Sequence, residues 1–89
     1  MSSIKRLKKD INYIFGDIID EVNFKQLVKP EITDEQVEKL VDEVVANYES
    51  FYQKIHEGRK VANKKEYFKN LTAEINQAVN DLTKKIEAL

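Results

Sequence analysis

The chain has 89 residues, with 15 lysines and arginines, 16 aspartates and glutamates, and a net charge of −1. This length is enough for one modest hydrophobic core, so we expect a single domain over residues 1–89. Because there is no cysteine, disulfides and thiolate metal sites are excluded. The basic N-terminus is not followed by a signal-peptide core, and no run resembles a membrane span. We therefore expect a cytoplasmic protein without membrane contact.

The first predicted helix covers residues 3–28, with Ser3 as its expected N-cap. A stripe of apolar side chains follows the helical period and should face the core. The stripe consists of Ile4, Leu7, Ile11, Ile14, Phe15, Ile18 and Val22. We expect the helix to end at about Val28, because Pro30 disfavours the helical conformation of Lys29.

The second predicted helix, over residues 34–57, has the clearest start signal in the chain. Thr33 and Gln36 match a capping box, and Ile32 with Val37 can form a hydrophobic staple. Apolar residues then alternate spacings of four and three, which is typical of the packing seam of a bundle. The seam consists of Val37, Val41, Val44, Tyr48, Phe51 and Ile55. Gly58 is expected to end the helix as a left-handed C′ residue.

The third predicted helix covers residues 64–88 and follows the basic connector 59–62. Asn63 and Glu66 resemble a second N-cap pair. The expected core face of this helix consists of Phe68, Leu71, Ile75, Ala78, Val79, Leu82, Ile86 and Leu89. Three long helices joined by short links predict an all-α, up-down-up antiparallel three-helix bundle.

Charge is distributed unevenly along the chain. Residues 1–9 carry a net charge of +4, residues 10–43 carry −7, and residues 44–69 carry +3. The antiparallel topology should therefore gather basic side chains at one end of the bundle. The expected basic residues are Lys5, Arg6, Lys8, Lys9, Lys54, Arg59, Lys60, Lys64 and Lys65. The expected acidic residues towards the other end are Asp17, Asp20, Glu21, Glu31, Asp34, Glu35 and Glu38.

Catalytic and metal-binding patterns are not evident, so we predict no enzyme, no cofactor and no metal site. His56 is the only histidine, which excludes a two-histidine metal site within one chain. No phosphate-binding loop, nucleophile elbow or metalloprotease pair occurs. A helical enzyme stays open as an alternative, since small chorismate mutases are also built of three long helices. Such a site needs basic residues inside the bundle, whereas Arg6 and Arg59 lie in exposed-looking segments.

The segment Lys8-Lys9-Asp10-Ile11-Asn12-Tyr13, followed by Gly16-Asp17-Ile18-Ile19-Asp20-Glu21, resembles the opening of an uncharacterised protein family. That family consists of short, all-helical bacterial proteins of the kind found in Bacteroidetes. The resemblance covers the first part of the chain. It implies a helical fold and supplies no ligand, activity or site residue.

We therefore expect a small, non-enzymatic protein–protein interaction module, such as an adaptor or regulator. The candidate partner surface consists of Tyr13, Asp17, Asp20, Phe24 and Leu27, which share one side of the first helix. Its partner would be another protein or a second copy of the chain. The alternative is an anion or nucleic-acid binder that uses Lys5, Lys8, Arg59, Lys60 and Lys64. Nucleic acid is disfavoured, because the chain is mildly acidic and lacks a recognisable binding motif.

Overall fold

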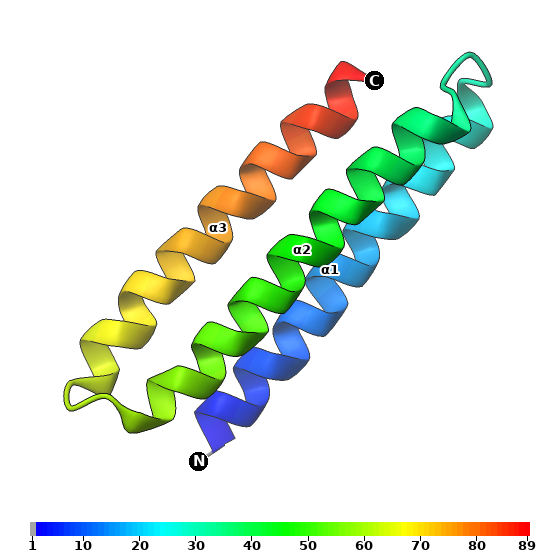
Figure 1. Cartoon of the computed structure of the whole chain (residues 1–89). Coiled ribbons are helices and arrows are strands. Elements are labelled where there is room, and N and C mark those ends of the chain that lie inside the picture. The colour runs from blue at the N-terminus through cyan, green and yellow to red at the C-terminus, as the bar shows by residue number, and fades with distance from the viewer. Residues whose placement is uncertain (1) are drawn as a thin grey trace.

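The computed structural model describes residues 2–89, with side chains from residue 4 onward, as a bundle of three α-helices (Figure 1). Helix α1 spans Ser2–Val28, α2 spans Asp34–Glu57, and α3 spans Lys64–Ala88. A short 3-10 helix, η1, spans Gly58–Lys60. No strand occurs in residues 2–89, and the predicted up-down-up three-helix bundle is confirmed. Helix α1 begins one residue before the predicted start, and the side chain of Ser3, the expected cap, lies outside the described residues.

The turn between α1 and α2 is held from both sides. The predicted capping box is confirmed, since the Gln36 amide N–H donates to Thr33 Oγ1 at 3.1 Å and the Thr33 amide N–H donates to Gln36 Oε1 at 2.9 Å. Ile32 is buried, with 3% of its surface exposed. From α1, Gln26 Nε2 donates to the Ile32 carbonyl at 3.0 Å. These contacts fix α2 antiparallel to α1.

The core lies along the shared axis of the three helices, and α1 packs more extensively on α2 than α3 packs on either. Its aromatic centre is Phe15, whose ring centroid lies 6.0 Å from that of Phe51 and 6.2 Å from that of Tyr48. Among the side chains of residues 4–89, no buried one is polar or charged. Folding therefore depends on apolar burial, which contributes about 25 cal/mol per Å².

The predicted seam of α2 was too narrow. Leu40 is buried although the seam omitted it, whereas Val41 and Tyr48 are only half-buried. The physical reason is that α2 packs against both α1 and α3, so it buries a wider arc than the single stripe of a two-helix seam.

The predicted left-handed conformation of Gly58 is wrong. Its φ of −62° and ψ of −16° are ordinary right-handed values, and the chain continues into η1. Space is the requirement at this position, because a Cβ on Gly58 would lie 2.5 Å from Phe68 Cζ and 2.7 Å from Tyr67 Cε2. Tyr67 is held in place by its hydroxyl, which donates to the Lys54 carbonyl at 2.9 Å. We call the contact among Gly58, Tyr67 and Phe68 the α2–α3 corner.

The two glycines should respond in opposite directions to the same substitution. Nothing lies within 4 Å of a Cβ built on exposed Gly16 in α1. Gly16→Ala should therefore stabilise the fold by about 0.5–1 kcal/mol through helix propensity. Gly58→Ala should destabilise it by about 1–3 kcal/mol, because two rings must move. Urea denaturation followed by circular dichroism measures the free energy of unfolding of both variants. Equal changes in the two variants would contradict the close packing of Gly58 against Tyr67 and Phe68.

A charge in the centre of α2 should abolish cooperative unfolding. Val44 is 0% exposed, so Val44→Asp buries a carboxylate without a partner, at a cost of several kcal/mol. Val45→Asp is the matched control, because the neighbouring Val45 is 39% exposed. Thermal denaturation should show a broad or absent transition for Val44→Asp and a nearly unchanged one for Val45→Asp. A normal melting curve for Val44→Asp would show that this side of α2 is not buried.

Candidate interaction surfaces

Helix α1 begins, α2 ends and α3 begins at the same end of the bundle (Figure 1). These three helix ends are rich in lysine and arginine. We call this region the basic end. It contains Lys5, Arg6, Lys8, Lys9, Lys54, Arg59, Lys60, Lys64 and Lys65. The N-termini of two helices, each with a positive partial charge, meet at the same place. Asp10, Glu57 and Glu66 lie at the same helix ends, so positive charge is in excess there but is not unopposed. This excess favours an anionic ligand.

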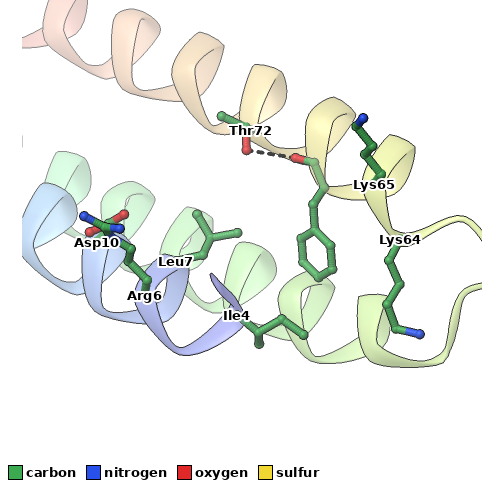
Figure 2. Close-up of a pocket in the computed structure, with 8 residues that line it drawn as sticks. Ile4, Arg6, Leu7, Asp10, Lys64, Lys65 and Thr72 are labelled. Carbon is green, nitrogen blue, oxygen red and sulfur yellow. Dashed lines mark hydrogen bonds between the residues drawn. The ribbon is translucent and has the colours of Figure 1, made fainter. Parts of the chain in front are cut away.

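An open cleft of about 490 Å³ lies at the basic end, between α1 and α3. We call it the basic-end cleft. Its apolar lining comes from Ile4, Leu7 and Phe68, and its polar lining comes from Arg6, Asp10, Lys64, Lys65 and Thr72. Figure 2 shows Ile4 and Leu7 opposite the start of α3, from which Lys64 and Lys65 extend in different directions. The cleft combines apolar side chains with three cationic groups and one carboxylate.

Some basic residues already have partners inside the molecule. Lys8 Nζ lies 5.1 Å from the centroid of the Tyr52 ring, which is within the range of a cation–π contact. Lys54 Nζ bonds Glu74 Oε1 at 3.0 Å. In the described part of the chain, no ion pair or side-chain hydrogen bond involves Arg6, Lys64 or Lys65, so their charges remain available to a ligand.

A second candidate surface lies on α1, opposite the buried stripe of that helix. We call it the outer face of α1. It consists of Arg6, Lys9, Tyr13, Asp17, Asp20, Phe24 and Leu27, all exposed and within roughly 80° of one another by helical period. Tyr13, Phe24 and Leu27 are 63%, 62% and 77% exposed, as their positions off the stripe predicted. With Val28, these residues make α1 the helix that presents most of the large exposed apolar side chains among residues 4–89.

The residues that the sequence assigned to an anion-binding end all lie at the basic end, but only one of them lines the cleft. Lys64 lines the basic-end cleft, whereas exposed Lys5, Arg59 and Lys60 lie outside its lining. Lys8 lies against Tyr52 and so contributes to packing as well as charge.

The apolar lining of the cleft was missed from the sequence. Ile4, Leu7 and Phe68 were assigned to the core because they continue the same stripes as the buried residues, yet each is only half-buried. No local signal distinguishes them, since their exposure depends on how far α1 and α3 lie apart at this end.

His, Asp and Glu are the side chains of this chain most suited to holding a metal ion. Among the described residues, no three of them lie close enough together to do so. His56 is exposed in the last turn of α2. None of the helices in residues 2–89 has an apolar stretch long enough to cross a membrane.

Comparison with known proteins gives no match to a family model, to a curated protein or to a solved structure. The resemblance of the first helix to an uncharacterised bacterial family therefore stays a prediction. The fold defines the class of molecule as a small all-α three-helix bundle, and the two candidate surfaces are the features from which a function can be argued.

Proposed function

We propose that the protein is a non-enzymatic protein–protein interaction module, an adaptor or regulator, whose basic-end cleft binds an acidic amphipathic helix of another protein. The observation that carries this proposal is the combination of apolar lining and unpaired cationic rim in one open cleft. A groove between two helices accepts a third helix along its length, as in many helix-in-groove complexes. Such a helix would cover Ile4, Leu7 and Phe68 with its apolar side.

The charges of the rim decide which helix fits. Arg6, Lys64 and Lys65 surround the apolar lining, so acidic residues flanking the apolar stripe of a partner would be attracted to them. Rim ion pairs raise the association rate and the specificity more than the affinity. The affinity itself would come from apolar burial at about 25 cal/mol per Å², reduced by the entropic cost of association. Moderate, salt-sensitive binding is the expected result.

The test uses a designed peptide helix with leucines on one side and glutamates along both flanks. NMR titration of the labelled protein should shift the signals of Ile4, Leu7 and Phe68 first, with a dissociation constant in the micromolar range. Lys64→Glu with Lys65→Glu should weaken binding at least tenfold, equivalent to about 1.4 kcal/mol. Lys39→Glu with Lys84→Glu is the matched control, since both lysines are exposed and neither lines the cleft. Equal losses in both double variants, or shifts located elsewhere, would contradict the proposal.

A second candidate function is binding of a polyanion, including nucleic acid, at the basic end. The meeting of two helix N-termini with several lysines favours it, whereas the net charge of −1 disfavours it. This candidate requires no apolar contact. If it is correct, heparin should bind, and a variant of the designed peptide with serine in place of each leucine should bind as well as the leucine peptide does.

Polyanion binding at the basic end should be weak and strongly dependent on salt. Fluorescence titration with heparin or single-stranded DNA should show binding at low ionic strength that is lost by about 0.2 M salt. Reversing the charges of Lys5, Lys60 and Lys64 together should abolish it. No binding at low salt would remove this candidate and leave the protein-partner proposal untouched.

A further inference from the structure

The outer face of α1 carries its charges in a fixed order along the helix. Arg6 and Lys9 come first, Tyr13 is central, and Asp17 and Asp20 follow, all of them exposed. The helix dipole does not account for this order, because it disfavours positive charge near a helix N-terminus. Across residues 4–89, no ion pair or side-chain hydrogen bond engages any of these four charged groups. The pattern therefore has no partner within the chain.

The spacing of these residues is symmetric about Tyr13. Lys9 and Asp17 lie four residues before and after it, and Arg6 and Asp20 lie seven residues before and after it. An antiparallel copy of the same helix, rotated about a twofold axis at Tyr13, places opposite charges against each other at all four positions. We propose that the outer face of α1 binds the same face of a second copy in this register, forming an antiparallel, isologous dimer.

The centre of the proposed interface has side chains suited to a twofold axis. The two Tyr13 rings would meet there and could stack in an offset arrangement. A Cβ built on Gly16, three residues after Tyr13, would have nothing within 4 Å, so this position leaves room for the opposing ring. Small residues beside a helix crossing allow the two backbones to approach closely. Tyr13 is then the large apolar side chain of the outer face of α1 that lies nearest the axis.

Other registers are less favourable. An antiparallel register that pairs Tyr13 with Phe24 of the second copy gives a better apolar match, but it places Asp17 against Asp20. A parallel arrangement places each charged group against its own copy. Repulsion between like charges disfavours these other registers, as it disfavours wrong partners at many interfaces. Charge therefore selects the register centred on Tyr13.

This surface is separate from the basic-end cleft except at Arg6, which lies at the edge of both. The dimer would therefore leave Ile4, Leu7 and Phe68 accessible. Exposed ion pairs contribute little each, so the dimer should form only at high micromolar concentration and low salt.

The first experiment is sedimentation equilibrium of the full chain at concentrations up to about 1 mM, at low and at high salt. The wild type should form a dimer at low salt and dissociate at high salt. The variant Arg6→Glu/Lys9→Glu should be monomeric, and so should Asp17→Lys/Asp20→Lys. An equimolar mixture of these two variants should form a one-to-one heterodimer, because every pair across the axis is again opposite in charge. A strict monomer for the wild type, or no heterodimer in the mixture, would overturn the proposal.

The second experiment tests the register, because general attraction between acidic and basic variants does not require Tyr13 at the axis. The chain has no cysteine, so a single introduced cysteine reports on its own position. Tyr13→Cys should form a disulfide-linked dimer on mild oxidation at low salt. Leu27→Cys, on the same face but without a counterpart in this register, should not. Efficient crosslinking at residue 27, or none at residue 13 in a chain that sediments as a dimer, would refute the arrangement. Lys64→Glu with Lys65→Glu should leave dimerisation unchanged, which separates this result from that of the cleft.

Discussion

The packing of Tyr67 and Phe68 against Gly58 is the contact on which the arrangement of the bundle depends. A side chain at residue 58 would occupy the space of both rings, so the absence of a Cβ lets α3 begin directly beside the end of α2. The hydroxyl of Tyr67 ties the start of α3 to the backbone of α2 through the Lys54 carbonyl. Phe68 serves both regions, because it forms part of the α2–α3 corner and also lines the basic-end cleft. The position of the cleft therefore follows from the corner.

The topology then concentrates positive charge at one end of the bundle. An up-down-up bundle must place the start of α1 beside the start of α3, and both of these segments are rich in lysine. Contacts such as Lys8 with Tyr52 and Lys54 with Glu74 offset part of the repulsion. Exposed pairs of this kind typically contribute about 0.2–1 kcal/mol each, so these contacts offset only part of the positive charge of the basic end. A ligand that supplies negative charge would offset the remaining positive charge, and this is our reason for proposing a binding site there.

Local patterns predicted most of the fold. The Thr33–Gln36 capping box and the position of Pro30 fixed helix ends to within a residue, because both act through neighbouring backbone groups. The helical period also placed Tyr13 in solvent, since the buried stripe of α1 lies on the opposite side. Gly58 was misread because its role depends on Tyr67 and Phe68, which follow it by several residues and approach it only in three dimensions.

The candidate surfaces were predicted unevenly for the same reason. The helical period alone predicts which residues of α1 are exposed, but it does not predict the apolar lining of the cleft. Ile4 and Leu7 have the spacing of core residues, and only the separation of α1 from α3 leaves them accessible at this end. Helix separation is set by side-chain packing along the whole bundle, so no short segment of sequence records it.

The central claim is that α3 starts beside the start of α1 and so builds the basic-end cleft. Because the chain has no cysteine, spin labels can be attached to introduced pairs, and double electron–electron resonance can measure the distance between them. The two pairs are Arg6→Cys with Lys65→Cys and Arg6→Cys with Lys84→Cys, all at exposed positions. Residues 65 and 84 are separated by roughly 28 Å along α3 at 1.5 Å per residue. The 6–65 distance should therefore be much the shorter of the two. Similar distances in both pairs, or a shorter 6–84 distance, would contradict the account.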